Sequence, residues 1–241
     1  MNDMQHSSTQ RILTVIPARG GSKGVPRKNI VIVNGCPLIE YTISAAMKVD
    51  GLTDVVVSTD DSEIAEISKA LGAYVPFLRP AELASDMSQS APVVAHALNA
   101  MEKIKGYHYD AIMMLQPTSP LRRSDHIEKA LELFFSQECD SVVSVVSVGG
   151  THPLRMKRLV EGELVNYIDQ DFWDMRPRQL LPDAYIRNGS IYLIKRDVLI
   201  EQEQLIGKKC LGLVMSEEES VNIDSPLDLR LAELLLQERD S

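Results

Sequence analysis

Ile12-Leu-Thr-Val-Ile16, followed by Arg19-Gly-Gly-Ser-Lys-Gly-Val-Pro-Arg-Lys28, is the stretch that decides the fold of this chain. The apolar run predicts a buried β-strand. The loop after it mixes four cationic side chains with three glycines, which let backbone N–H groups approach phosphate oxygens closely. Because the whole chain carries a net charge of −9, this loop predicts a local anion site rather than a general affinity for polyanions. A solvated basic turn is the alternative, since the spacing matches neither a P-loop nor G-x-G-x-x-G.

Composition restricts the class of protein. With 241 residues and 44% hydrophobic content, the chain can form one α/β domain with a substantial core. No apolar run approaches the ~20 residues that span a bilayer. Residues 1–10 are polar, lack the apolar segment of a signal peptide, and are expected to form a disordered tail before a domain over 11–241. Three separated cysteines suggest neither a disulfide framework nor a zinc site, and we expect a cytoplasmic protein without a membrane or nucleic-acid partner.

Strand-like and helix-period segments alternate along the chain, which predicts a mostly parallel sheet covered by helices on both faces. Ligands of such sheets bind beyond the carboxyl ends of the strands, here the loops 17–29, 58–61 and 116–123. Asp60 with Glu63 is interpreted as a capping box at one helix start. The predicted strands are 12–16, 55–58, 111–115, 141–148, 191–194 and 211–215, and the predicted helices are 38–48, 62–71, 93–104, 125–135 and 226–237.

Residues 149–184 interrupt this alternation with glycine and proline pairs and predict a small hairpin-rich insertion. The insertion contains Tyr167, Phe172 and Trp173, which need a surface to bury against. We therefore expect a dimer contact, although packing on the insertion's own domain is equally open.

The segment Leu115-Gln-Pro-Thr-Ser-Pro-Leu-Arg122 predicts a rigid polar loop at a strand end. Its two prolines restrict the backbone, and Gln116 offers donors and an acceptor to a polyhydroxylated ligand. The loop also leads into a helix with Ser124 as its expected N-cap.

Near the C-terminus, Ser225-Pro-Leu-Asp228 predicts a helix start in which the serine caps and Asp228 is the third residue. Capping does not explain Asp224. With Asp228 or Asn222 it could offer hard oxygen ligands to Mg²⁺, which shares carboxylates with substrate phosphates.

Two further segments carry weaker indications. Arg178, in Pro177-Arg-Gln-Leu-Leu-Pro182, could bind a carboxylate through both guanidinium nitrogens, or could be an ordinary surface arginine. Residues 78–90 are too polar for a core and could cover a nucleotide base. Asp169-Gln-Asp171 has the D-x-D pattern of metal-dependent glycosyltransferases, but its place in the irregular insertion favours an acidic surface turn.

Taken together, these motifs resemble the acylneuraminate cytidylyltransferases, or CMP-sialic acid synthetases. The resemblance runs from about Arg11 to the C-terminal helix and rests on residues 16–24 with Lys28-Asn29, residues 115–122, Arg178-Gln179, Arg187-Asn-Gly189, and Ile223-Asp224 with Asp228. It implies a Rossmann-like nucleotidyltransferase fold and a homodimer whose insertion reaches the partner's site. It also implies that CTP and a nine-carbon 2-keto sugar acid (sialic, legionaminic or pseudaminic) give the CMP-sugar and pyrophosphate, with Mg²⁺ as cofactor.

The resemblance also assigns roles to residues. It implies that the CTP phosphates are held by Arg19, Ser22, Lys23, Lys28 and Asn29, and that Arg79, Ser88 and Ser90 lie near the cytidine. It places Gln116, Arg178 and Gln179 at the sugar acid and the metal on Asp224, with Asp228 as a second candidate. Arg19, Lys23, Lys28 and Asp224 are the expected catalytic residues. Family members often have Asp-x-Asp where this chain has Asn222-x-Asp224, and no motif here identifies the sugar.

The expected chemistry is an in-line attack of the anomeric 2-hydroxyl on the α-phosphorus of CTP, promoted by positioning and charge neutralisation. Two alternatives remain open at this point. A glycosyltransferase using Asp169 and Asp171 would transfer a sugar without releasing pyrophosphate. A CTP-binding protein that had lost its metal site through Asn222 would bind the nucleotide without turnover.

Overall fold

A central six-stranded sheet organises the computed structural model, which describes residues 10–169 and 172–239. Its strands follow the order β10 (Cys210–Val214), β6 (Ser141–Ser147), β9 (Tyr185–Lys195), β5 (Ala111–Leu115), β1 (Ile12–Pro17) and β4 (Asp54–Ser58). The pairs β10–β6, β5–β1 and β1–β4 are parallel, whereas β9 is antiparallel to both of its neighbours. The sequence-based prediction of a mostly parallel sheet is therefore confirmed.

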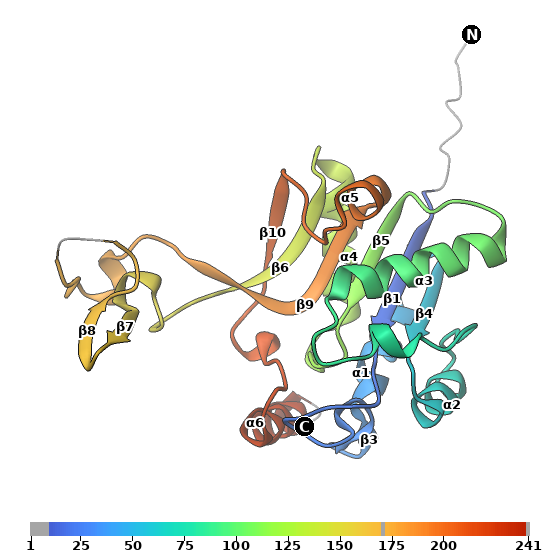
Figure 1. Ribbon diagram of the computed structural model, residues 1–241, viewed down its shortest axis with the longest axis horizontal. Coiled ribbons are helices and arrows are strands. Elements are labelled where there is room, and N and C mark those ends of the chain that lie inside the picture. Colours follow the sequence, from blue (N-terminus) through green and yellow to red (C-terminus); the bar gives the residue numbers. More distant parts are fainter. Residues whose placement is uncertain (1–9, 170–171, 240–241) are drawn as a thin grey trace, which may run out of the picture.

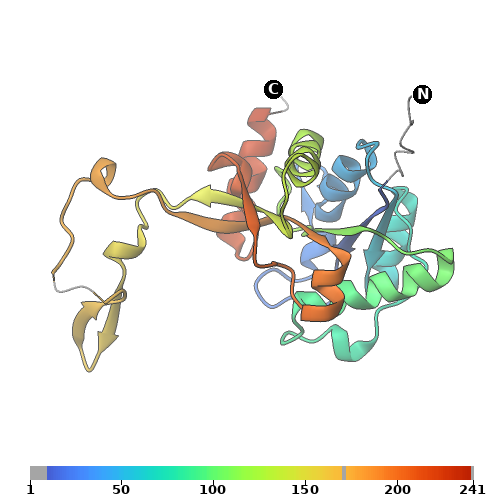
Figure 2. The same ribbon diagram turned by 90° about the horizontal axis from the view of Figure 1, so that it is seen from above.

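Helices cover both faces of the sheet (Figures 1 and 2). One face packs against α1 (Leu38–Met47), α2 (Ser62–Ala70) and α4 (Ser124–Ser136). The other packs against α3 (Ser90–Lys105) and α5 (Arg196–Gln202). Strands β1 and β5 are buried along almost their whole length, as continuous apolar runs with helices on both sides require.

A third apolar cluster anchors the end of the chain beside the first loop. Helix α6 (Pro226–Arg239) buries Ala232 and Leu236 against Val25 and Val33, which follow β1 in sequence. This packing brings residues 222–225, just before α6, next to the cationic loop. Two short strands, β2 (Ile32–Val33) and β3 (Cys36–Pro37), form a small hairpin here.

The arm formed by the 149–184 insertion projects away from the body at the end of β6 and β9 (Figures 1 and 2). It carries the hairpin of β7 (Lys157–Val160) and β8 (Glu163–Asn166), so the predicted hairpin is present. Short 3-10 helices complete the described chain at Lys28–Ile30, Ala81–Leu83, Pro153–Arg155, Arg178–Leu180 and Glu218–Ser220.

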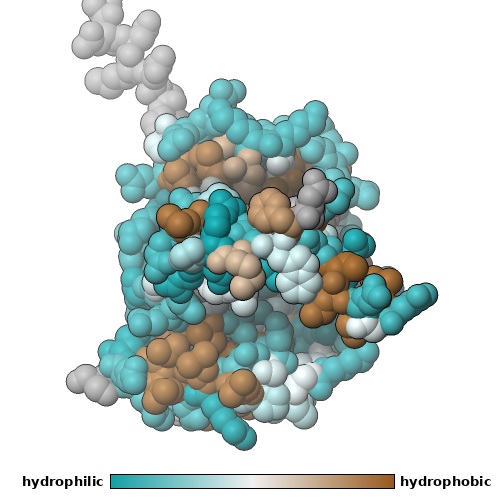
Figure 3. Space-filling model, turned by 90° about the vertical axis from the view of Figure 1, so that its left-hand side faces the viewer, coloured by the Kyte–Doolittle hydropathy of each residue, from teal (hydrophilic) through white to brown (hydrophobic). Residues whose placement is uncertain are grey.

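Apolar side chains are exposed on the arm and on α6. Figure 3, which faces the arm, shows brown apolar patches there and at the lower edge, where α6 lies. The exposed arm residues include Leu159, Leu164, Tyr167, Phe172 and Trp173. The three aromatic side chains are more than half exposed, and Trp173 packs under the Lys157 ammonium of the same arm at 4.6 Å from the ring centre, so packing on their own domain is partial. Whether a second chain covers them stays a prediction.

Two predictions fall partly outside the described residues: the N-terminal tail, of which residues 1–9 are not described, and the second aspartate of Asp169-Gln-Asp171. Within the described ranges, no helix combines the length and apolar character that crossing a membrane demands.

Candidate active site

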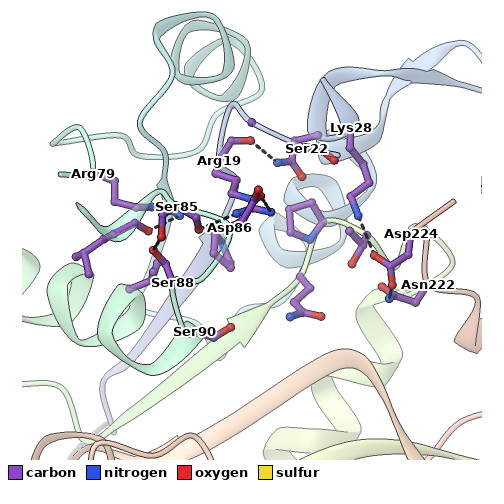
Figure 4. A pocket seen from close by; sticks show the side chains of 18 residues that line it. Arg19, Ser22, Lys28, Arg79, Ser85, Asp86, Ser88, Ser90, Asn222 and Asp224 are labelled. Carbon is purple, nitrogen blue, oxygen red and sulfur yellow. Dashed lines mark hydrogen bonds and ion pairs between the residues drawn. The ribbon is translucent and has the colours of Figure 1, made fainter. Parts of the chain in front are cut away.

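The loops after β1, β4 and β5 converge at one edge of the sheet, as parallel strands require. The loops after β1 and β5 border a cavity of about 360 Å³, together with residues between Arg79 and Ser90. Figure 4 shows Arg19 and Asp86 in its middle, Lys28, Asn222 and Asp224 on one side, and Arg79, Ser85, Ser88 and Ser90 on the other. The lining therefore includes these predicted site residues: Arg19, Ser22, Lys28, Asn29, Arg79, Ser88, Ser90, Gln116 and Asp224.

The cationic loop is held against the segment before α6. The Lys28 ammonium donates to the Ile223 carbonyl at 2.8 Å and to Oδ1 of Asp224 at 2.9 Å. Asn29 is buried and donates to the Arg19 carbonyl at 2.9 Å. Lys28 and Arg19, distant on the loop, are thereby kept on opposite sides of one cavity.

Asp86 is the main site residue that sequence reasoning missed. Its carboxylate accepts from Arg19 at 2.8 Å and from Lys23 at 2.7 Å, and Arg19 also donates to the Ser85 carbonyl at 2.7 Å. Hydrogen bonding to Lys23 and the two cationic charges hold the pKa of Asp86 below its usual range. The only sequence signal was its place in the polar 78–90 segment, which was expected to cover a base.

Lys23 itself does not line the cavity. Its side chain is 84% exposed and reaches the site only through Asp86. A cation so placed is free to turn toward a phosphate, because little packing holds it.

Arg79 lines the cavity, but its guanidinium is turned toward the strand end. It donates to the hydroxyl of Ser58 at 3.2 Å and also bonds the Ser58 carbonyl. Burial lowers the pKa of Arg79 to about 10, with Asp60 opposing the shift. These hydrogen bonds hold the end of β4 next to the polar segment that carries Asp86 and Ser88.

Gln116 is positioned from two sides. The fully buried Arg122 donates to the Gln116 carbonyl at 3.1 Å and to the Ser190 carbonyl at 2.9 Å, and burial lowers its pKa to about 9. Gly189 has φ +78°, and a Cβ there would lie 2.6 Å from Oε1 of Gln116. Gln116 and Ser90 also line a second cavity of about 360 Å³, bordered by Arg187, Tyr192 and residues 203–206.

Asn222 and Asp224 bring oxygen atoms into the first cavity. The Asn222 amide donates to Oδ2 of Asp224 at 2.9 Å, while the buried Oδ1 of Asn222 has no partner. Asp228 does what capping predicts: its Oδ2 accepts from the Ser225 amide at 2.7 Å, and the Ser225 hydroxyl accepts from the Asp228 amide at 3.3 Å. Asp228 is absent from the described lining, and its metal role stays a prediction.

Arg178 and Gln179 lie apart from the other site residues of the chain. They border a different cavity of about 390 Å³ at the base of the arm, with His152 and the segment after β10. The described chain therefore does not bring them to Gln116, and their contact with the sugar stays a prediction.

Comparison with known proteins shows which family this chain is similar to. The cytidylyltransferase family matches residues 13–209. CMP-N,N'-diacetyllegionaminic acid synthase of Legionella pneumophila is 35% identical over 94% of this chain and 97% of its own. Pseudaminic acid cytidylyltransferase of Campylobacter jejuni is 31% identical over 92% and 95%.

A solved structure of CMP:2-keto-3-deoxy-manno-octonic acid synthetase complexed with CTP superposes with a TM-score of 0.70. It covers 95% of this chain and all of its own at 18% identity, so it supports the fold. The family match includes the cationic loop, the arm and all strands of the central sheet except β10. The chain belongs to the cytidylyltransferase family.

Proposed function

We propose that this cytidylyltransferase activates a nine-carbon 2-keto sugar acid with CTP, giving the CMP-sugar and pyrophosphate. The observation that carries the proposal is that one cavity is lined by the cationic loop, Gln116 and Asp224. A nucleoside triphosphate and an acceptor hydroxyl need such a joint site, because in-line displacement requires both in one geometry. The two relatives act on different nonulosonic acids at similar identity, so the sugar itself is left to experiment.

The charges of the lining residues indicate which side of the cavity binds the nucleotide. Arg19, Lys28 and Asn29, with Ser22, offer donors to the triphosphate, and Lys23 joins them once Asp86 moves aside. Ser88, Ser90 and Arg79, which is held by its hydrogen bond to Ser58, border the end of the cavity that is assigned to the cytidine. The cations and amide donors of this lining support direct transfer by positioning and charge neutralisation.

The sugar side is assigned to the neighbouring cavity. Gln116 and Ser90 belong to both cavities, so an acid placed in the second one reaches the α-phosphate at their junction. Arg187 lies in that second lining and provides a cation for the sugar carboxylate.

The donors present fit Mg²⁺. The described residues contain no cluster of three His, Cys, Asp or Glu side chains. The unpartnered Oδ1 of Asn222 beside the Asp224 carboxylate suits a hard cation that takes its other ligands from phosphates and water. Asp224 and Asn222 would hold the ion, which supplies charge neutralisation at the phosphates and acidifies the attacking hydroxyl. Lys28 keeps the Asp224 carboxylate oriented.

We also propose a homodimer in the cytoplasm. The exposed apolar side chains of the arm need a partner surface, and Arg178 with Gln179 can meet a sugar acid only across such an interface. Within the described residues the cysteines form no disulfide bond, which supports a reducing compartment.

The test is pyrophosphate release from CTP with Mg²⁺ against N-acetylneuraminic, legionaminic, pseudaminic and KDO acids. Release with one nonulosonic acid is expected and names the substrate. The variant Asp224→Asn, which removes the proposed metal ligand's charge, should lower pyrophosphate release roughly 10²–10³-fold. If none of the acids gives pyrophosphate release while CTP still binds, the non-catalytic alternative is favoured. Sugar transfer without pyrophosphate release would favour the glycosyltransferase alternative.

A further inference from the structure

The cationic loop contains a fourth cation, Arg27, that does not line the cavity. Its guanidinium pairs with both carboxylate oxygens of Asp61 and with Glu63, at the start of α2. Glu63 is on the exposed first turn of that helix, and Asp61 is its N-cap. Arg27 therefore faces away from the anion site and toward the neighbouring strand–helix unit.

Both ends of the loop are attached to this same point. At the start, the Gly20 amide donates to Oδ1 of Asp60 at 3.0 Å, and a Cβ on Gly20 would lie 2.7 Å from Oδ2 of Asp61. At the end of the loop, Arg27 is attached to α2 by its ion pairs with Asp61 and Glu63. The interpretation of Asp60 with Glu63 as a capping box was wrong by one residue: Asp61 accepts from the Glu63 and Ile64 amides at 3.0 Å each, which leaves Asp60 to bind the loop.

The backbone at Arg27 connects this attachment to the site. Arg27 has φ +54°, a left-handed conformation that a non-glycine residue adopts rarely. Lys28 comes next and begins the short 3-10 helix, closed by the Ile30 amide on the Arg27 carbonyl at 3.0 Å. The direction in which Lys28 leaves the loop is thus set by the residue before it.

We propose that Arg27 is a positioning residue for the triphosphate site: its ion pairs with Asp61 and Glu63 attach the cationic loop to α2 and aim Lys28 at the cavity. The hydrogen bond from Arg27 holds the pKa of Asp61 low, so the pair stays charged at neutral pH. The inference rests on the proposed function in that CTP supplies the triphosphate.

The experiment measures binding of CTP with Mg²⁺ by calorimetry, and of pyrophosphate alone, to full-length variants. Arg27→Gln removes the charge and shortens the side chain, but keeps a polar group that can donate hydrogen bonds. Asp61→Asn removes the ion pair with Asp61, leaves the one with Glu63, and keeps an N-cap, since asparagine caps about as well as aspartate. Positioning predicts that Arg27→Gln weakens CTP binding roughly tenfold, that Asp61→Asn weakens it by no more than this, and that the double variant binds CTP no more weakly than Arg27→Gln.

Several outcomes separate positioning from other roles. If Arg27 bound phosphate directly, Asp61→Asn would loosen its attachment to α2 and tighten CTP binding, which would overturn the proposal. Arg27→Lys should restore part of the affinity, and the KM for the sugar acid should not change. Arg196→Gln is the matched control, because Arg196 also binds a carboxylate, Glu102, through two nitrogens away from the cavity. It should leave CTP binding unchanged.

Stability and nucleotide identity are checked separately. A fall in melting temperature for Arg27→Gln no larger than that of Arg196→Gln, with weakened CTP, supports positioning. Equal affinity of wild type and Arg27→Gln for both ligands contradicts it. If wild type binds pyrophosphate but not CTP, the proposed function fails, while the comparison on pyrophosphate still decides the role of Arg27.

Discussion

Gly24 lies so close to the segment before α6 that a Cβ there would be 2.0 Å from the Asp224 carbonyl oxygen. The obstructing atom belongs to the backbone, so it cannot swing aside as a flexible side chain would. At the scale of single residues, the site depends on such close approaches, because they let the Lys28 ammonium reach Asp224.

Gly24→Ala should therefore push residues 223–225 away from the loop. We expect kcat to fall on the order of tenfold or more, since small misplacements of catalytic groups are costly. Gly150→Ala is the control, because a Cβ at Gly150 meets nothing within 4 Å. Steady-state kinetics with CTP and the sugar acid provide the measurement, and equal kcat for the two variants would contradict the packing argument.

Asp86 gives a second prediction at this scale. Its ion pairs with Arg19 and Lys23 occupy the cations assigned to the triphosphate, so CTP has to displace an internal anion. Asp86→Asn should tighten CTP binding severalfold at most, since ion pairs exposed to solvent are weak and are screened by salt. Equilibrium binding at low and moderate salt tests this, with Asp197→Asn as a surface control. Weaker binding would instead mean that Asp86 helps to hold the nucleotide.

At the scale of elements, α3 and α5 are joined to each other at the end of the sheet away from the site. Arg196, at the start of α5, donates to both oxygens of Glu102 on α3 at 2.8 and 2.9 Å. His108 lies 2.8 Å from the same carboxylate. Burial would raise the pKa of Glu102, but hydrogen bonds from Arg196 and His108 outweigh it and lower that pKa to about 2.

A carboxylate whose pKa is depressed on folding stabilises the protein above its ordinary pKa of 4.5, and that contribution disappears as the pH falls toward 2. Glu102→Gln should thus lower the free energy of unfolding at pH 7 by on the order of 1–2 kcal/mol. The difference from wild type should shrink below pH 4.5. Urea unfolding of both proteins at pH 7, 5 and 4 measures it, and a difference independent of pH would show that the ion pair contributes nothing.

At the scale of the whole molecule, the arm stands apart from the body (Figure 1). Leu159 on β7 is 71% exposed there. If the arm forms the dimer contact, Leu159→Lys should convert a dimer into a monomer in light scattering. CTP binding should persist, because its cavity lies within one chain, while transfer to the sugar acid falls with the loss of Arg178 and Gln179 from the partner.

Ile104→Lys changes an exposed apolar residue near the end of α3 and is the control for this prediction. It should leave the assembly unchanged. A monomeric wild type with full activity would remove the need for a partner chain altogether.

The sequence by itself determined the elements whose patterns are local. Continuous apolar runs marked β1 and β5, helical periods marked α1, α2, α4 and α6, and glycines among cations marked the anion loop. Helix α5 and the β2–β3 hairpin were not predicted, because seven and two residues per element are too few to establish a period. The first half of β9, before Ile191, begins with three exposed residues and continues with Asn188, Gly189 and Ser190, so it carries no apolar run.

Only the tertiary structure decided which residues meet. Antiparallel β9 inserts between β5 and β6 and places Gly189 against Gln116, a contact set by strand order rather than by local sequence. Three contacts of the site join residues that are 34 to 67 positions apart in the sequence: Asp86 with Arg19, Asp60 with Gly20, and Asp61 with Arg27. Propensity acts over a few residues, whereas these pairs form only when separate strand–helix units pack side by side. That is why the residue types of the site could be read from the sequence while its ion pairs could not.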